Sequence, residues 1–373
     1  MTAPPGAGPY PALAALAAVE LPGQATPFAV VDLDAMERNI ARMAGYFGER
    51  PAGLRPHFKH HKCSEIARLQ IAAGAVGITC QTSDEAAAAV RAGIEDVLIA
   101  SVVADRTRLA ALARCAADAR VTVAVDSAAA AGLAAEAAAG EGVVLGVVVE
   151  YDIGMHRSGV ASIPEAVALA EHVAALAGLE LRGVMAYEGH LVKVADRDER
   201  AAAVRAAFAP MPELLEALRD HGFEAGMVTG GATSTYDCAG SLAFMTDVEA
   251  GSYVLMDAAY AQLVPEFEPA LAVIATVATS RPGRPLVVDA GSKRIGSEAG
   301  RPVLAGFPAT HQATSEEHNR FVVEGARMPA VGDRVAIVPG HTCSTVALYR
   351  TLVGCRDGRR ERVLAIDGRD PLA

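Results

Sequence analysis

Short apolar runs alternate with longer alanine-rich amphipathic stretches from residue 27 to about residue 256. The apolar runs have the length of strands, and the amphipathic stretches repeat their apolar positions at helical spacing. Such alternation is typical of parallel strands joined by crossover helices. We predict strands at residues 28–34, 54–58, 76–80, 96–101, 120–126, 143–152, 181–187, 226–230 and 246–251.

These nine candidates are one more than a TIM barrel contains. When the first, FAVVDLD, is set aside, the other eight form consistent strand–helix units. The sequence therefore predicts an α/β fold whose main part is a TIM-type (β/α)8 barrel over residues 33–256. FAVVDLD is then available to join another sheet.

The sequence pattern changes after about residue 260, where short β-rich runs are separated by Gly and Pro. Examples are PLVVDAG, RVAIVPG, STVALYRTLVG and RRERVLAI. We predict a second, mostly antiparallel β domain over residues 257–373, completed by the N-terminal strand around 26–32. Residues 1–25 are expected to form a flexible lead-in.

The charge and hydropathy of the chain exclude two classes of binding partner. Asp and Glu number 44 against 33 Lys and Arg, a formal charge of −11, which argues against nucleic acid and anionic membranes. No apolar run is long enough to span a bilayer. The N-terminal apolar patch has no basic residue before it, and the six cysteines contain no CxxC pair. We therefore expect a cytoplasmic protein with reduced thiols.

Lysine chemistry has few candidates, because the sequence contains only Lys59, Lys62, Lys193 and Lys293. Lys59 follows a predicted strand and precedes a helix in LRPHFKHHKC, and reactive groups of barrels lie at the carboxyl ends of strands. A deprotonated lysine there can form a Schiff base with a carbonyl cofactor. The alternative is a basic, solvated loop, since lysines are mostly surface residues.

Three further strand ends carry polar residues, in EYDIGMHRSG (150–159), AYEGHLVK (186–193) and VTGGATSTYD (228–237). Glycines at a strand end let backbone amides approach an anion, and phosphate sites recur late in such barrels. A simple tight turn is the alternative for the Gly-Gly pair.

In the β domain, His341 and Cys343 stand two residues apart in VPGHTCSTVALY. On an extended segment these side chains point the same way and suit a divalent metal such as zinc. Residues 316–318 (EEH) or water would have to complete the coordination, and a chance pairing is the alternative.

Taken in order, eight segments resemble a known family: RPHFKHHK, GITCQTSDEA, EYDIGMHRSGV, GGATSTYD, GSYVLMDAAY, VVDAGSK, EEH and PGHTCSTVALY. They are similar to the D-threonine aldolase and D-serine dehydratase family of fold-type III pyridoxal 5'-phosphate (PLP) enzymes, which are related to alanine racemase. The resemblance covers about residues 26–365. Such relatives are commonly homodimers, and we expect one here.

The resemblance implies roles for individual residues. Lys59 corresponds to the lysine that binds PLP, Arg157 to an arginine that approaches the cofactor ring, and Tyr187 to a tyrosine near the pyridine nitrogen. His341 and Cys343 correspond to the metal ligands. The remaining cofactor-binding residues that it implies are Gln81 and, around the phosphate, Gly230, Gly231, Ala232, Thr233, Gly251 and Ser252. We add His190 as the candidate second catalytic base.

The implied activity is a PLP- and divalent-metal-dependent lyase acting on D-β-hydroxy amino acids. GGATSTYD, GSYVLMDAAY and STVALY are similar to the aldolase branch, which favours retro-aldol cleavage to glycine and an aldehyde. HTC is instead similar to the dehydratase branch. The aldolases more often carry His-x-Asp at this position. Elimination to a 2-oxo acid and ammonia is therefore the alternative, with an amino-acid racemase and a non-catalytic PLP carrier as weaker ones. Cysteine favours zinc, whereas a carboxylate would favour manganese or magnesium.

Overall fold

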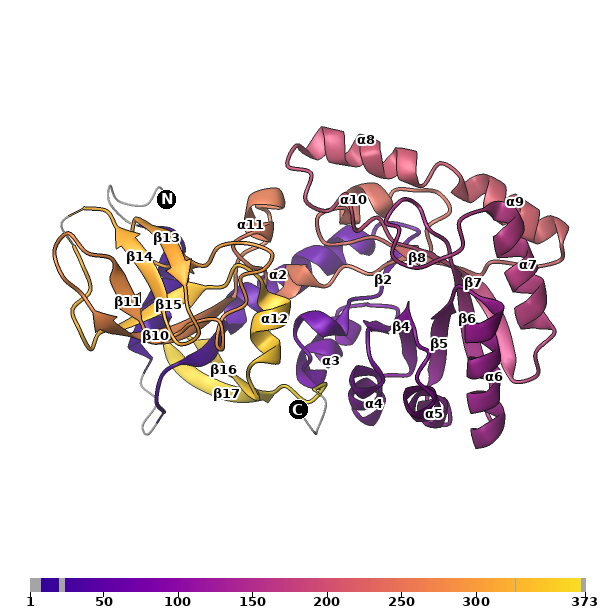
Figure 1. The fold of residues 1–373 in the computed structure, drawn as a ribbon, viewed down its shortest axis with the longest axis horizontal. Coiled ribbons are helices and arrows are strands. Elements are labelled where there is room, and N and C mark those ends of the chain that lie inside the picture. The colour runs from indigo at the N-terminus through magenta and orange to yellow at the C-terminus, as the bar shows by residue number, and fades with distance from the viewer. Residues whose placement is uncertain (1–7, 20–23, 326, 370–373) are drawn as a thin grey trace. The chain divides into compact units, whose positions relative to one another are not determined.

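The computed structural model describes residues 8–19, 24–325 and 327–369, and its chain forms two compact units (Figure 1). The β unit comprises Met1–Arg42, His60–Cys63 and Ser252–Ile366. The barrel unit comprises Met43–Lys59, Ser64–Gly251 and Asp367–Ala373. The chain therefore enters each unit more than once. No helix among the described residues has the length and apolarity needed to cross a membrane.

The barrel unit is built on a sheet of eight parallel strands in the order β2-β9-β8-β7-β6-β5-β4-β3. Pro56 O accepts a hydrogen bond from Thr79 N at 2.9 Å, and a parallel bridge joins His57 to Thr79, so the two outer strands meet. This arrangement confirms the predicted barrel class. The strands are β2 (Gly53–Leu54), β3 (Ile78–Cys80), β4 (Asp96–Val102), β5 (Arg120–Val125), β6 (Leu145–Glu150), β7 (Leu179–Ala186), β8 (Met227–Gly230) and β9 (Asp247–Val248).

Five of the crossover helices begin where a short polar side chain caps the first turn. Thr82, Asp105, Ser127, Ser162 and Asp196 each accept a hydrogen bond from the backbone amide three residues later. The helices that connect the barrel strands are α3 (Ser64–Ala72), α4 (Ser83–Arg91), α5 (Arg106–Cys115), α6 (Ala128–Glu141), α7 (Ile163–Ala174), α8 (Arg197–Ala207), α9 (Met211–Asp220) and α10 (Tyr236–Ala239). A further helix, α2 (Leu33–Phe47), contains the first division between the units.

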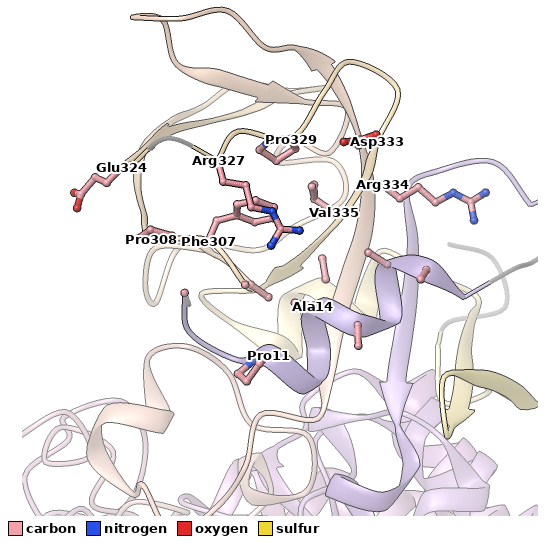
Figure 2. A pocket seen from close by; sticks show the side chains of 18 residues that line it. Pro11, Ala14, Phe307, Pro308, Glu324, Arg327, Pro329, Asp333, Arg334 and Val335 are labelled. Atoms are coloured by element: carbon pink, nitrogen blue, oxygen red, sulfur yellow. The ribbon is translucent and has the colours of Figure 1, made fainter. Parts of the chain in front are cut away.

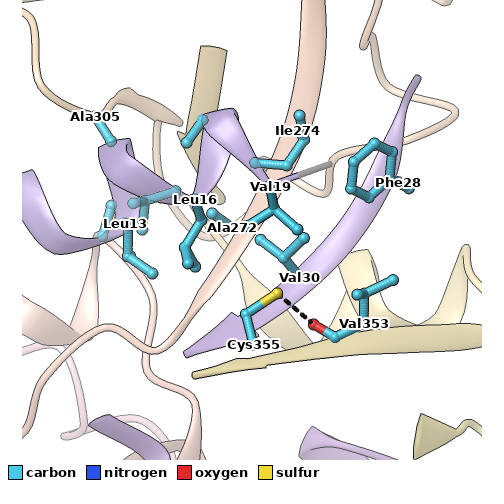
Figure 3. Packing of buried hydrophobic residues seen from close by; sticks show 13 residues of the cluster. Leu13, Leu16, Val19, Phe28, Val30, Ala272, Ile274, Ala305, Val353 and Cys355 are labelled. Atoms are coloured by element: carbon cyan, nitrogen blue, oxygen red, sulfur yellow. Dashed lines mark hydrogen bonds between the residues drawn. The ribbon is translucent and has the colours of Figure 1, made fainter. Parts of the chain in front are cut away.

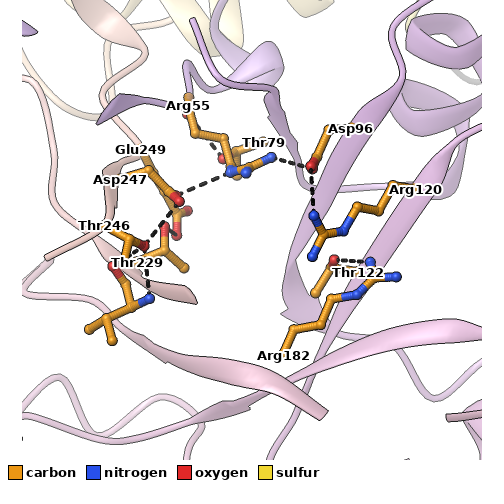
Figure 4. Close-up of polar contacts among 11 residues, drawn as sticks. Arg55, Thr79, Asp96, Arg120, Thr122, Arg182, Thr229, Thr246, Asp247 and Glu249 are labelled. Carbon is orange, nitrogen blue, oxygen red and sulfur yellow. Dashed lines mark hydrogen bonds and ion pairs between the residues drawn. The ribbon is translucent and has the colours of Figure 1, made fainter. Parts of the chain in front are cut away.

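A buried charge network lies inside the barrel unit (Figure 4). The Arg55 guanidinium donates to Asp247 Oδ1 at 3.1 Å and to Asp96 Oδ1 at 2.6 Å, and only 4% of its side chain is exposed. Because both carboxylates neutralise it, Arg55 can be buried between strands that lie far apart in the sequence.

The β unit contains a nine-stranded, mostly antiparallel sheet with β1 (Phe28–Asp32) in its interior. β1 pairs antiparallel with β10 (Leu271–Thr279) and parallel with β16 (Thr351–Arg356). FAVVDLD, which was expected to join a second sheet, therefore supplies β1 of the β unit. The other strands are β11 (Leu286–Val288), β12 (Val303–Leu304), β13 (Ala309–Thr314), β14 (Asn319–Val323), β15 (Arg334–Val338) and β17 (Arg359–Ala365).

The segment before β1 is helical where the sequence favoured a flexible lead-in. α1 (Pro11–Ala15) and η1 (Leu16–Ala18) bury Leu13, Leu16 and Val19 against the sheet (Figure 3). Burial of these three side chains removes apolar surface from water and so holds the segment in place. The expectation is wrong for residues 11–19, while residues 1–7 and 20–23 lie outside the described part of the chain.

The same N-terminal helices form one side of a groove of about 1010 Å³ within the β unit (Figure 2). The opposite side includes Phe307 and Arg327, whose guanidinium carbon lies 5.6 Å from the phenyl ring centre. None of the predicted site residues lines this groove.

Two local expectations in the β unit need correction. The run STVALY was expected to be part of a strand, but Thr342–Ala347 forms helix α12, with His341 at its N-cap position. The hydroxyl of Thr345 donates to His341 O at 2.7 Å and so supports the first turn. In addition, strands β13 and β14 were not predicted; in β13, ATHQAT has polar residues on both of its faces.

Candidate active site

Lys59 lies in the short η2 helix (Phe58–His60), immediately beyond β2 at the carboxyl end of the barrel strands. Its own amide donates to His57 Nδ1 at 3.4 Å, and its side chain is half-buried. The structure therefore places Lys59 beyond the end of its strand, as the sequence predicted. Its role stays a prediction.

A buried carboxyl, Glu249, interacts electrostatically with Lys59. Burial raises the pKa of Glu249 to about 7, against the opposing effect of the Thr229 hydroxyl, which donates to Glu249 Oε1 at 3.0 Å. Nearby Asp247 raises this pKa further, and the positive charges of Lys59 and Arg55 lower it. The barrel interior thus presents an acid that titrates near neutrality to its candidate catalytic amine.

Gln81, directly after β3, is held from several directions. Its Oε1 accepts a hydrogen bond from His57 Nε2 at 3.2 Å, and its Nε2 donates to Ala100 O at 3.1 Å. Its amide donates to Glu85 Oε2 at 2.7 Å. These contacts hold Gln81 beside His57, two residues before Lys59, at the carboxyl end of the barrel strands.

Arg157 and Tyr187, which come from the loops after β6 and β7, are brought together. The guanidinium carbon lies 5.6 Å from the Tyr187 ring centre, and Arg157 Nη2 lies 3.6 Å from Glu150 Oε1. Glu150 is buried, which raises the pKa of its carboxyl, and among the described residues its Oε2 has no hydrogen-bond partner. His190 is exposed, and a Cβ atom at Gly154 would lie 3.2 Å from its Nε2, so His190 lies beside the loop that carries Arg157.

Residues 230–235, which we name the phosphate turn, are all buried and mostly small. A Cβ atom at Gly230 would lie 1.9 Å from Ala186 O, and Gly231 adopts a φ of 82°, so glycine is required at both positions. The Gly231 amide donates to Glu188 Oε2 at 3.2 Å, and the Ala232 amide donates to Thr235 Oγ1 at 2.9 Å. Gly251 follows β9 in the barrel unit, whereas Ser252 begins η3 (Ser252–Val254) of the β unit.

His341 and Cys343 do not lie on the extended segment that was expected, since Cys343 is already in α12. Each contacts another donor of the β unit. His341 Nδ1 is hydrogen-bonded to Glu298, and Cys343 Sγ lies 3.2 Å from His60 Nδ1. Glu317, in the segment that was considered as a third ligand, pairs with Lys293 instead.

These donors have the chemistry of a metal site without forming a full one. Imidazole, thiol and carboxylate groups suit a borderline ion such as zinc. Across the described ranges, no group of three or more His, Cys, Asp or Glu side chains is close enough to hold a metal ion.

The barrel residues fit PLP. A half-buried primary amine stands at a strand end, a turn of small residues is available for a phosphate, and the orphaned Glu150 Oε2 lies beside Arg157. An aldehyde cofactor with one phosphate and one aromatic ring needs these three kinds of group.

Comparison with known proteins decides the family. Residues 31–259 match the alanine racemase N-terminal domain, and residues 270–355 match a putative serine dehydratase domain. D-threonine aldolase of Arthrobacter sp is 35% identical over 350 residues, covering 92% of this chain and 92% of that protein. The chain belongs to the D-threonine aldolase and D-serine dehydratase family.

Solved structures of family members agree. The D-threonine aldolase from Filomicrobium marinum superposes with a TM-score of 0.89 at 37% identity, covering 92% of this chain and 95% of that one. The D-threo-3-hydroxyaspartate dehydratase from Delftia sp. HT23 gives a TM-score of 0.81 at 28% identity, covering 94% and 98%. The family and fold predictions are both confirmed, and the protein is a PLP-dependent lyase.

In this lyase, three buried carboxyls were given no role from sequence. Glu150, Glu188 and Glu249 each follow or end a barrel strand, and burial raises the pKa of all three. For Glu150 and Glu249 the signal is an acidic residue within an apolar strand segment, VVLGVVVEYD or TDVEAG, whereas Glu188 lies outside such a segment. His60 and Glu298, the partners of Cys343 and His341, carry no comparable signal because their contacts arise only on folding.

Proposed function

We propose that the protein cleaves D-β-hydroxy amino acids by a retro-aldol reaction, giving glycine and an aldehyde. The observation that carries this proposal is the similarity to D-threonine aldolases, at 35–37% identity over 92% of the chain. The 3-hydroxy-D-aspartate aldolase of Paracoccus denitrificans (strain Pd 1222), at 32% identity over 92% of both chains, supports the same reaction type.

PLP supplies an electron sink for a bond broken at the α-carbon of an amino acid. In the proposed site Lys59 would hold PLP, Arg157 and Tyr187 would contact its ring, and Gln81 supports His57 beside the lysine. His190 Nε2 would accept the proton of the substrate β-hydroxyl as the bond between the α- and β-carbons breaks, and return of one proton to the α-carbon would complete glycine. The exposed position of His190, beside the loop that carries Arg157, supports this role.

We further propose that His341 and Cys343 hold a divalent metal, which supplies Lewis acidity toward a hydroxyl group. The family's dehydratase structures support this assignment. They include one variant with a histidine replaced and one with a cysteine replaced, the latter in a metal-free form, and the two substituted positions are two residues apart. His341 and Cys343 have the same spacing.

That shared His-x-Cys spacing also favours a second candidate, elimination of water to a 2-oxo acid and ammonia. The D-threo-3-hydroxyaspartate dehydratase of Delftia sp. (strain HT23) is 33% identical over 87% of this chain and 92% of that protein. In this reaction Lys59 Nζ would remove the α-proton, whereas retro-aldol cleavage leaves that proton in place.

A product assay tests both candidates. The enzyme is incubated with the enantiomers of threonine, serine and threo-3-hydroxyaspartate, with and without EDTA, and glycine is measured beside 2-oxo acid and ammonia. We expect glycine from D-substrates, and loss of turnover with EDTA. Equimolar 2-oxo acid and ammonia without glycine would replace the first proposal with the second. Full activity after chelation would show that neither candidate reaction requires the metal.

A further inference from the structure

A buried carboxyl, Glu188, links the loop after β7 to the phosphate turn that follows β8. Glu188 is fully buried, and both of its carboxyl oxygens accept hydrogen bonds from the turn. Oε2 accepts from the Gly231 amide at 3.2 Å, and Oε1 accepts from the Thr235 hydroxyl. Thr235 Oγ1 in turn accepts from the Ala232 amide at 2.9 Å. The two amides at the start of the turn are therefore committed to internal partners.

The turn has other attachments that do not involve Glu188. Ser234 Oγ donates to Val192 O at 2.8 Å, and the buried Arg200 Nε donates to Ser234 O at 2.8 Å. Removal of Glu188 would leave these in place, so the turn would stay attached while its first residues lost their anchor. Gly231 is the sensitive position, because glycine can adopt many backbone conformations and its φ of 82° is therefore fixed by its hydrogen-bond partners.

The charge of this carboxyl matters for an anionic ligand. An ionised carboxylate under the turn would repel a phosphate group. Burial raises the pKa of Glu188 and so favours its neutral form, in which it can still accept from an amide and exchange a hydrogen bond with Thr235. A neutral carboxyl fixes the turn without opposing the phosphate.

We propose that Glu188 is the positioning residue of the phosphate turn, holding the Gly231 amide and the Thr235 hydroxyl so that residues 230–235 keep the shape that receives the phosphate of PLP. It acts through the turn and does not itself bind the cofactor. The proposal rests on the PLP dependence of the family and is independent of whether the reaction is an aldol cleavage or a dehydration.

The test compares PLP with pyridoxal, which has the same aldehyde and ring but no phosphate. Apoenzyme is titrated with each compound, and the dissociation constant is read from the change in coenzyme absorbance. For Glu188→Ala we expect the affinity for PLP to fall about tenfold or more, with the affinity for pyridoxal changed by less than about threefold. Glu188→Gln should keep both affinities, because its amide offers the same acceptor and a donor for Thr235 Oγ1.

Thr235→Val provides a second route if Glu188→Ala does not fold. This substitution replaces the hydroxyl by a methyl group, and the affinity for PLP should fall while the affinity for pyridoxal is kept. Thr122→Val is the matched control, since Thr122 is a fully buried barrel threonine that accepts from Arg182 Nη1 at 2.7 Å at the start of β5 (Figure 4). It should leave the PLP-to-pyridoxal ratio unchanged. Equal losses for PLP and pyridoxal in Glu188→Ala and Thr235→Val, or no loss, would overturn the proposal. So would a glutamine variant as weak as the alanine variant.

Discussion

Glu249→Gln gives a direct test of the buried acid beside Lys59. Burial raises the pKa of Glu249 from its ordinary 4.5 to about 7 in the folded barrel. The folded state therefore favours the protonated carboxyl. Its stabilising effect is complete below pH 4.5 and is lost as the pH rises through 7. Glutamine mimics the protonated form at every pH.

The size of the effect follows from the two pKa values. A difference between about 4.5 and about 7 corresponds to about 3 kcal/mol of unfolding free energy well above pH 7, and to less than about 1 kcal/mol at pH 5. Between pH 5 and pH 8, Glu249→Gln should thus gain about 2–3 kcal/mol relative to the wild type. In a barrel of this size that is about 5–10 °C in Tm.

Thermal unfolding of the apoenzyme at pH 5, 6, 7 and 8 measures the difference in Tm between variant and wild type. Glu180→Gln is the control, because it makes the same chemical change at a glutamate of β7 that is 56% exposed and so lacks the burial of Glu249. If the Glu249→Gln and wild-type curves run parallel across this range, the carboxyl does not titrate near neutrality and the reasoning is refuted.

Three further predictions concern the site and the barrel. Lys59→Ala should abolish the visible absorbance of bound PLP without unfolding the protein; persistence of the band would redirect the assignment to another lysine. Cys343→Ala should lower the bound metal measured by atomic absorption and the turnover rate, with the PLP spectrum intact, and unchanged metal content would contradict the ligand assignment. Arg55→Met should destabilise the barrel by about 3–5 kcal/mol, because it leaves Asp247 buried without its counter-ion. Arg106→Met breaks an exposed pair and should cost less than about 1 kcal/mol, so similar Tm losses would refute the comparison.

The barrel could be predicted because its signals are local. Eight apolar runs correspond to β2–β9, and the runs of β3–β7 are each followed by a helix with a side-chain N-cap; the ninth run, FAVVDLD, lies in another sheet. The order of eight motifs identified the family, and with it the expected positions of the coenzyme-binding residues.

The remaining features depend on contacts between distant residues. STVALY is rich in β-branched residues, yet its first turn is supported by the Thr345 hydroxyl, and it forms α12. Leu13, Leu16 and Val19 were expected to belong to a flexible lead-in, because the sheet residues that bury them are distant in the sequence. The role of Glu188 depends on partners more than 40 positions away, so no pattern near residue 188 reveals it.

The position of β1 has a consequence for synthesis of the chain. This strand leaves the ribosome early, but its hydrogen-bonding partners, β10 and β16, belong to the last third of the sequence. Until they emerge, FAVVD is an apolar segment with unpaired edges, open to association with other chains. Truncation from the C-terminus should therefore expose this N-terminal strand, and shortened products are expected to aggregate even when every barrel strand is present.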